Sequence, residues 1–309
     1  GSRVLSRLQT DARYSIRAAT RRSDSHFPPR VSAVRVEDLS GTTKWDSALA
    51  GVGTVVHLAA RVHVMRETAK DSVAAFRAVN VEGTLSLARR ARDFGAKRFV
   101  FLSSAKVNGD MSSSPFRECD PPAPGDPYAV SKYEAEIGLR EIAAATGLEV
   151  VIIRPPLVYG PGVKGNFLAL MRVVARGIPL PLGAVDNRRS LVALDNLVDF
   201  IVACVDHPSA ADHTFLVSDG EDVSTADLIR RVARMMKRPV RLIPIPAGLL
   251  SGGAALLGMR AVAQRLLGSL QVDISKARNL LRWVPPATLD DGLRQAVSYF
   301  YASSEARRL

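Results

Sequence analysis

The stretch KRFVFLSS, residues 97–104, is an apolar run that ends in two serines. Four further runs rich in β-branched residues lie on either side of it, namely YSIRAAT (14–20), SAVRV (32–36), GTVVHLAA (53–60) and LEVVIIRP (148–155). Helical patterns over 43–50, 71–94 and 128–147 separate these runs. Strands that alternate with helices form crossover units around a parallel sheet. The sequence therefore predicts an α/β fold with a doubly wound parallel sheet.

The composition changes near residue 160. Proline and glycine become frequent, and the apolar runs become short, in PPLVYGPG (155–162), GIPLPLG (177–183) and IPIPAG (243–248). We expect a first domain over 1–160 and a smaller mixed lobe over 161–309 that packs over the ends of the sheet.

The first residues are unusual for this fold. An open parallel sheet that binds a dinucleotide begins with a strand and a glycine-rich turn, whose last glycine opens the first helix. This chain begins at Gly1, and SRVLSRLQ (2–9) follows as a predicted helix. Gly1 is either the last glycine of such a turn or a cloning remnant. In both cases we expect the first strand and most of the turn to be missing.

The composition is that of an ordinary globular protein, with 309 residues of which 47% are hydrophobic. Cys119 and Cys204 lie in no CxxC or Cys/His cluster, so the sequence predicts neither a disulfide framework nor a metal site. No signal peptide opens the chain, which favours the cytoplasm. The net charge of +12 comes from dispersed arginines, a pattern that argues against nucleic-acid binding and suits an anionic substrate.

Residues 247–268, AGLLSGGAALLGMRAVAQRLLG, form the one segment that raises the question of a membrane. Arg260 and Arg265 interrupt it, so no uncharged run reaches the ~20 residues that span a bilayer. We interpret the segment as a buried helix or a lid. Interfacial membrane contact is the less favoured alternative.

PYAVSK, residues 127–132, places Tyr128 and Lys132 four positions apart at the start of a predicted helix, so the two side chains share one face. A phenol ionises near ~10 and is a poor base at neutral pH unless a nearby positive charge lowers its pKa. An ammonium on the same face favours the phenolate, which makes the pair a candidate for acid–base chemistry. The alternative is an ordinary helix start with Tyr128 packed on the core.

Three other stretches carry candidate site residues. Ser104 ends the run KRFVFLSS, and the carboxyl ends of parallel strands are where such sheets bind ligands. Asn80 lies within a long predicted helix, where a buried amide needs a partner. The small residues of HLAA (57–60) allow close approach of a cofactor. Taken singly, the three have structural explanations: a cap, a satisfied core amide and strand-end packing.

Together and in this order, these stretches resemble the extended short-chain dehydrogenase/reductase family, especially its nucleotide-sugar epimerases, dehydratases and ketoreductases. The resemblance covers nearly the whole chain and includes Gly1, HLAA (57–60), NVEGT (80–84), LSSAKVNG (102–109), YAVSK (128–132), RPPLVYGPG (154–162), RRSLVALDNLVD (188–199) and SKARNLLRWVP (275–285). It implies a Rossmann-like, dinucleotide-binding domain over 1–160 and a substrate-binding lobe over 161–309.

The resemblance implies catalytic roles for three residues. Tyr128 would exchange a proton with a sugar hydroxyl or ketone, Lys132 would lower its pKa and hold the nicotinamide ribose, and Ser104 would hydrogen-bond the reacting oxygen. The resemblance places the cofactor against Gly1, Arg21, Arg22, Leu58, Ala59, Ala60, Asn80, Ser103, Tyr128, Lys132 and Pro155. It places the substrate against Ser104, Lys106, Asn108, Asn166 and Arg189, with Arg189 at the diphosphate.

Departures from the family pattern narrow the reaction. Nucleotide-sugar 4,6-dehydratases carry an Asp-Glu pair where this chain has Ala105 and Lys106, so dehydration is disfavoured. The usual VYG that follows reads VNG (107–109) here, which changes the local substrate contact.

The residues after the second predicted strand bear on the cofactor. An acidic residue there binds the adenosine ribose of NAD, whereas an arginine accommodates the extra phosphate of NADP. This chain has Arg21 and Arg22, with Asp24 one step too late. We therefore expect NADP in preference to NAD, and the alternative is that both arginines point into water.

These observations favour an NAD(P)-dependent reductase of the C4 ketone of a UDP-linked 6-deoxy, N-acetylamino sugar in surface-polysaccharide synthesis. The alternative is a UDP-glucose or UDP-N-acetylglucosamine 4-epimerase with tightly bound NAD. A remoter alternative is a non-catalytic dinucleotide-binding scaffold, against which the joint presence of Ser104, Tyr128 and Lys132 argues. The resemblance also implies a homodimer formed through two long helices of each subunit.

Overall fold

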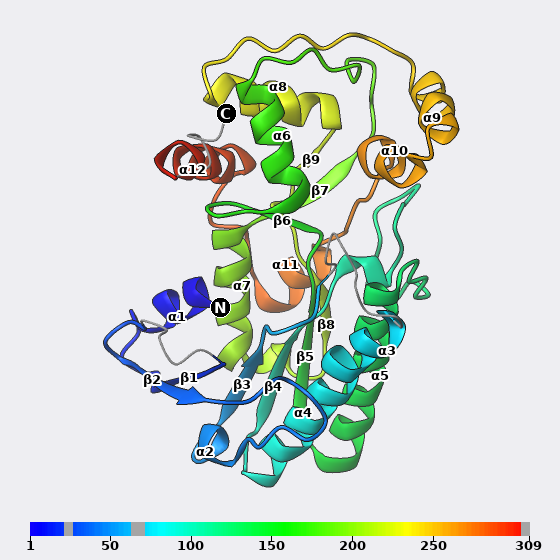
Figure 1. Cartoon of the computed structure of the whole chain (residues 1–309). Helices are drawn as coiled ribbons and strands as arrows, with labels where there is room; N and C mark the ends of the chain where they lie inside the picture. Colours follow the sequence, from blue (N-terminus) through cyan, green and yellow to red (C-terminus); the bar gives the residue numbers. More distant parts are fainter. Residues whose placement is uncertain (22–26, 63–71, 304–309) are drawn as a thin grey trace.

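The computed structural model describes residues 1–21, 27–62 and 72–303, which form two lobes (Figure 1). The helices are α1 (Ser2–Leu8), α2 (Asp46–Leu49), α3 (Ser72–Arg77), α4 (Thr84–Asp93), α5 (Pro127–Thr146), α6 (Gly165–Ala175), α7 (Leu194–Asp206), α8 (Thr225–Met235), α9 (Ala247–Leu256), α10 (Arg260–Leu267), α11 (Ser275–Leu281) and α12 (Leu289–Ala302). One π-helical turn, η1 (Ala78–Gly83), and two 3-10 turns, η2 (Ala105–Val107) and η3 (Pro208–Ala210), complete the described helical segments.

The first lobe is built on a parallel sheet. Its strands, in the order β3-β4-β5-β8, are β3 (Thr54–His57), β4 (Arg98–Leu102), β5 (Glu149–Arg154) and β8 (Thr214–Leu216). Two further strands, β1 (Ile16–Thr20) and β2 (Val31–Arg35), pair in parallel as a separate sheet. The α/β fold that the sequence predicts is confirmed.

Helices cover both faces of the four-stranded sheet, as Figure 1 shows. Alternate residues of β4 and β5 point to opposite faces. Phe99, Phe101 and Ile152 share one hydrophobic cluster with side chains of α4 and α5, whereas Val100 and Val151 share another with side chains of α7. Burial on both faces explains why these strands read as continuous apolar runs in the sequence.

Local sequence signals define both ends of α5. The Asp126 side chain accepts a hydrogen bond from the Ala129 backbone N–H at 2.7 Å, and Pro127 occupies the first turn, where its missing N–H costs nothing. Gly147 ends the helix with a left-handed φ of 70°, which glycine adopts without steric cost. The predicted helix over 128–147 thus begins one residue earlier and ends one residue earlier.

The other two predicted helices differ more from the structure. The pattern over 43–50 yields only the four-residue α2. The pattern over 71–94 is interrupted by the π-helical turn η1 between α3 and α4, although Gly95 does follow the helix end, with φ +85°. Amphipathic spacing cannot reveal the extra residue of a π turn, a feature that often accompanies functional sites.

The second lobe has its own small sheet and core. Its strands β6 (Leu157–Tyr159), β7 (Arg189–Ala193) and β9 (Asp222–Val223) pair in the order β6-β7-β9, in parallel and then antiparallel. Side chains from α6, α8 and α12 pack into one cluster that includes Met171, Ile229 and Phe300. The chain also returns to the first lobe after residue 160, because β8 pairs with β5.

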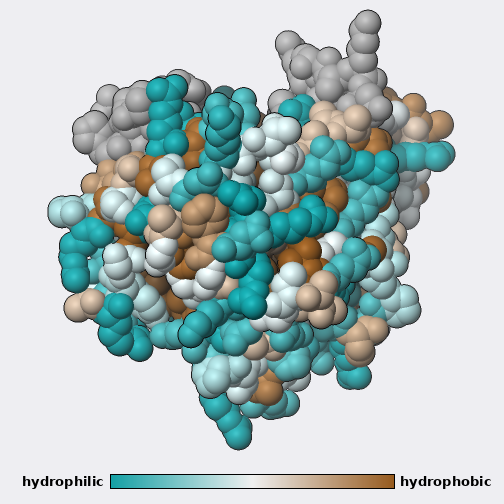
Figure 2. All heavy atoms as spheres, turned by 90° about the horizontal axis from the view of Figure 1, so that it is seen from below, coloured by the Kyte–Doolittle hydropathy of each residue, from teal (hydrophilic) through white to brown (hydrophobic). Residues whose placement is uncertain are grey.

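The end of the first lobe opposite the second lobe is polar overall. Figure 2 views the molecule from this end and shows hydrophilic residues interspersed with small, scattered hydrophobic areas.

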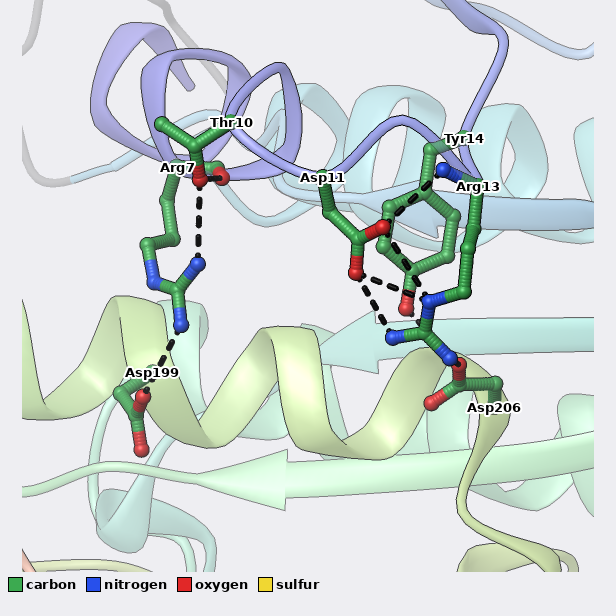
Figure 3. A network of polar contacts seen from close by, with 7 residues as sticks. All are labelled: Arg7, Thr10, Asp11, Arg13, Tyr14, Asp199 and Asp206. Carbon is green, nitrogen blue, oxygen red and sulfur yellow. Dashed lines mark hydrogen bonds and ion pairs between the residues drawn. The ribbon is translucent and has the colours of Figure 1, made fainter.

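Polar contacts fasten the N-terminal segment to α7 (Figure 3). The Tyr14 hydroxyl donates a hydrogen bond to the Asp206 carboxylate at 2.8 Å, and Arg13 lies 3.4 Å from the same carboxylate while also pairing with Asp11. Val4 and Leu8 of α1 are buried in the cluster that contains α7. Apolar packing and surface ion pairs therefore hold the first helix against α7.

The segment over 247–268 corrects one expectation from the sequence. It forms α9 and α10, but α9 has no buried residue, and Leu256 is 90% exposed. The interpretation as a buried helix is therefore wrong, because α9 packs chiefly against α10 at the edge of the second lobe instead of entering its core. Within the described part of the chain, no helix is both long and apolar enough to cross a bilayer.

A buried ion pair joins α5 to β5. The Arg154 guanidinium donates to both carboxylate oxygens of Glu136, at 2.9 and 2.5 Å, and both side chains are almost fully buried. Ser103 donates to the same carboxylate at 2.6 Å. Helix α5 is thus fixed to the end of β4 as well as to β5.

Substitution of Arg154 tests this junction. Arg154→Met leaves the Glu136 carboxylate buried without its two-pronged partner, and we expect the free energy of unfolding to fall by about 3–5 kcal/mol. Arg294→Met, which breaks the exposed pair with Asp291, is the matched control and costs at most about 1 kcal/mol. Urea unfolding measures both values, and equal losses would contradict a structural role for the buried pair.

Candidate active site

The carboxyl ends of β3, β4 and β5 gather most of the predicted site residues. A crossover helix runs antiparallel to the strands it connects, so the N-terminus of α5 lies at this edge of the sheet. The Lys132 ammonium donates a hydrogen bond to the Leu102 carbonyl at the end of β4, at 2.8 Å. Lys106, just after β4, contacts the Asp126 carboxylate that caps α5. These contacts bring the turn that begins at Ser104 to the helix end that carries Tyr128.

Tyr128 is half-buried, and its ring meets the edge of the Phe76 ring with 6.3 Å between centroids. Its hydroxyl has no hydrogen-bond partner among the described residues. Burial, with a smaller effect of the Asp126 charge, raises the pKa of Tyr128 to about 12. The expectation that Lys132 lowers this pKa is not met by the protein groups alone, because burial dominates.

Lys132 is 2% exposed, and its ammonium lies 4.4 Å from the centroid of the Phe101 ring. Burial lowers its pKa to about 7, a shift that the Glu136 carboxylate opposes. An ammonium has three N–H donors, and the Leu102 carbonyl uses one of them within the described structure. The remaining donors are what a ribose hydroxyl at this edge requires.

Ser104 has extended backbone and caps the turn η2, where its hydroxyl oxygen accepts from the Lys106 N–H at 3.3 Å. The structural explanation considered for this serine, a cap, is therefore correct. The same hydroxyl has no acceptor for its hydrogen within the described residues, so it can still donate to a ligand oxygen.

Asn80 is fully buried in η1. Its amide exchanges hydrogen bonds with the Arg61 backbone, accepting at 2.8 Å and donating at 3.0 Å, and it also donates to the Ser131 hydroxyl at 2.9 Å. It thereby fixes the segment after β3, including Ala59 and Ala60, against α5. Ala59 itself is exposed at this edge of the sheet.

Asn108 corrects a further expectation. Its amide donates to the Arg117 carbonyl and accepts from the Arg154 guanidinium, both at 3.0 Å, and the residue is 2% exposed. Both ends of the side chain are engaged inside the protein, so a direct substrate contact at this residue is wrong. Ser103 is likewise buried and bonded to Glu136.

The sequence reasoning missed the buried Glu136 and Arg154, which hold these serine and asparagine side chains. One signal was present, because Glu136 follows Lys132 by four positions on the same face of α5.

Other predicted residues occupy separate positions. Lys106 pairs with Asp126 and with Asp110, and the Pro155 carbonyl accepts from the Ala105 N–H at 2.9 Å, which places both residues at the same edge. Gly1 caps α1 with open space where a side chain would be, and Leu58 packs partly buried beside the cluster of α7. Asn166 is exposed at the start of α6.

Two of the three arginines predicted to contact a ligand lie within the described residues. Arg21 forms an exposed ion pair with Asp38 at 2.7 Å, and Arg22 lies outside the described residues. Arg189 donates to the carbonyls of Arg265 and Gly268, so its guanidinium holds the end of α10. Burial lowers the pKa of Arg189.

Two surface hollows lie away from these side chains. One, of about 300 Å³, is lined by residues of α5, β5 and β8, and the other, of about 440 Å³, lies between the 114–120 loop and α11. Neither is lined by Ser104, Tyr128 or Lys132.

The geometry agrees with what comparison with known proteins finds. Residues 1–218 match the model of the NAD dependent epimerase/dehydratase family. The chain belongs to this family. It is an NAD-dependent nucleotide-sugar enzyme of the extended short-chain dehydrogenase type, as the resemblance implied.

Individual relatives extend over nearly the whole chain. A UDP-glucose 4-epimerase of Vibrio cholerae is 43% identical over 303 residues, 97% of this chain and 92% of that protein. An N-acetyl-alpha-D-glucosaminyl-diphospho-ditrans,octacis-undecaprenol 4-epimerase of Escherichia coli O157:H7 is 28% identical over 298 residues, 92% and 88% of the two chains. The structure of a UDP-glucuronic acid 4-epimerase from Bacillus cereus in complex with NAD superposes with a TM-score of 0.78 at 20% identity, covering 98% and 95%.

The lowered pKa of Lys132 predicts a pH dependence of stability. Between a pKa of about 7 in the folded protein and ~10.4 in the unfolded chain, only the unfolded chain holds the proton. The free energy of unfolding should therefore rise with pH across this window, by on the order of a few kcal/mol.

Lys132→Met removes the titrating group, so the variant should lack this part of the rise, and Lys97→Met at an exposed position is the control. Urea unfolding at several pH values from 7 to 10 measures the difference. If the free energy of unfolding changed with pH in the same way for wild type and Lys132→Met, burial would not lower the pKa of Lys132.

Proposed function

We propose that this protein catalyses the 4-epimerisation of a UDP-hexose, with Tyr128 as the acid and base. The observation that carries the proposal is the convergence of Ser104, Tyr128 and Lys132 at one sheet edge, in a chain 43% identical to a UDP-glucose 4-epimerase. The reductase that we favoured from the sequence alone has the same three residues, and the relatives support the epimerase better.

The residues at the edge have distinct tasks. Tyr128, as the phenolate, would accept the proton of the sugar C4 hydroxyl when that carbon is oxidised to the ketone, and it would return the proton when the ketone is reduced on its opposite face. Ser104 donates a hydrogen bond to the oxygen on C4, and Lys132 donates to ribose hydroxyls. When bound, NAD accepts and returns the hydride, and its oxidised ring adds a positive charge that favours the phenolate.

The dinucleotide fits the residues present. Lys132 is buried with unused donors, the Tyr128 hydroxyl is unpaired in the described structure, and Ala59 exposes backbone without a bulky side chain. We propose NAD as the resident cofactor, in keeping with the family and with NAD in the similar epimerase structure. The NADP preference inferred from Arg21 and Arg22 is the competing proposal.

A second candidate substrate is a sugar carried by a lipid diphosphate, the kind that the name of the Escherichia coli relative states for that protein. The exposed leucines of α9, next to the segment that Arg189 holds, favour it over a purely water-soluble substrate.

Tyr128→Phe tests the catalytic assignment. Loss of the acid–base group should lower turnover of UDP-glucose to UDP-galactose by about 10²–10⁴-fold while the affinity for NAD stays nearly unchanged. Tyr133→Phe, on the same helix but a different face, should retain full turnover. If Tyr128→Phe turned over at the wild-type rate, Tyr128 would have no part in the mechanism.

The cofactor carried by the purified protein separates epimerase from reductase. An epimerase returns the hydride to its own substrate, so denatured protein should release about one NAD per chain. Released NADP, or turnover of a 4-keto sugar only with added NADPH, would instead support the reductase. Arg21→Ala then tests the NADP proposal. If Arg21 contacts the extra phosphate, its loss should weaken NADP binding at least tenfold and leave NAD binding unchanged.

A further inference from the structure

The exposed helices α9 and α10 form a second surface, which includes none of the residues to which we assign the chemical step. Leu249, Leu256 and Leu257 are 69%, 90% and 75% exposed, which makes them the most exposed large hydrophobic side chains in the described part of the chain. Met259 and Val262 continue the apolar surface. Five such residues lie within fourteen positions of this helix pair, and we call them the apolar patch. Exposed apolar surface concentrated in this way often marks an interaction site.

Hydrogen bonds from the second lobe fix the end of α10, which we call the base of the patch. The carbonyls at the end of α10 accept hydrogen bonds from three side chains of the second lobe. Arg189 donates to Arg265 and Gly268, Asn187 donates to Gly268 at 2.8 Å, and Thr225 donates to Leu266 at 2.7 Å. Leu250 and Leu267 pack against the core of this lobe. The exposed leucines are therefore held outward by a fixed helix pair.

The segment that carries the patch has charged residues of one sign along its sequence. Between Asp227 and Asp273 the sequence contains no acidic residue and eight basic ones: Arg230, Arg231, Arg234, Lys237, Arg238, Arg241, Arg260 and Arg265. Arg241, Arg260 and Arg265 are exposed and form no ion pair with any described residue. The segment thus combines exposed leucines with uncompensated arginines.

We propose that α9 and α10 dock on an anionic lipid bilayer, with the leucines in the headgroup–acyl boundary and the arginines at lipid phosphates. Apolar side chains flanked by basic ones are the pattern of interfacial membrane helices. The proposal replaces the earlier expectation that this segment avoids membranes, and it does not depend on which substrate the site takes.

Two other partners, a second copy of the chain and nucleic acid, suit the composition of the patch less well. A symmetric dimer through this patch would bring two acid-free, basic segments together, so like charges would oppose each other. Nucleic acid would meet the arginines, but residues 228–272 contain no Phe, Tyr or Trp on which a base could stack.

Vesicle flotation of the purified full chain tests the proposal. Wild type should float with vesicles of phosphatidylglycerol and phosphatidylethanolamine, and at least tenfold less should float with phosphatidylcholine alone or in 1 M salt. Leu256→Glu/Leu257→Glu should lower the partition coefficient at least tenfold. Val284→Glu, at a 67% exposed position outside the segment, is the matched control and should bind like wild type.

Two further variants separate the contribution of the apolar side chains from that of the charges. Leu256→Ser/Leu257→Ser removes apolar surface without adding charge, and Arg260→Gln/Arg265→Gln removes charge alone; each should weaken binding to the anionic vesicles. Thermal unfolding verifies that all variants fold. Failure of wild type to float, or equal flotation of the leucine variants, overturns the proposal. A wild-type dimer that the leucine substitutions convert to monomer without lipid would assign the patch to a second copy of the chain.

Discussion

The carboxylate of Glu136 is fully buried and accepts hydrogen bonds from Ser103, Arg154 and Arg140. Arg140 lies on α5 itself, whereas Ser103 follows β4 and Arg154 ends β5, so the buried carboxylate keeps its partners only where α5 lies within reach of both strand ends. This requirement fixes the helix against the ends of β4 and β5. The face of α5 that carries Glu136 carries Lys132 one turn earlier and Tyr128 one turn before that. The position of the candidate catalytic pair therefore follows from a contact that takes no part in the reaction.

Burial also determines how the groups at this edge ionise. It lowers the pKa of Lys132 to about 7 and that of the neighbouring His57 to about 3, and it raises the pKa of Tyr128. The protein alone thus favours uncharged side chains beside the strand ends. A positive charge beside Tyr128, such as that of an oxidised nicotinamide, would lower the pKa of the phenol.

Arg189 connects the second lobe to the exposed helices. The sequence resemblance assigned this residue to the substrate diphosphate, whereas the structure shows its guanidinium on carbonyls at the end of α10. The guanidinium is thereby engaged by the protein itself, and it links β7 of the second lobe to the base of the apolar patch.

Local signals, namely apolar runs, a helical pattern and a tyrosine four residues from a lysine, were enough to predict the parallel sheet, the ends of α5 to within one residue and the residue types of the site. The sequence could not show the contact of Asn80 with Ser131, the Glu136–Arg154 pair or the contact of Asn108 with Arg154, which join residues 18 to 51 positions apart. The sequence also could not show that α9 is exposed, because an apolar segment has the same sequence pattern whether it is buried in a core or lies on a surface. Only tertiary packing decides which side chains are left without partners, because burial and pairing depend on what the rest of the chain brings alongside.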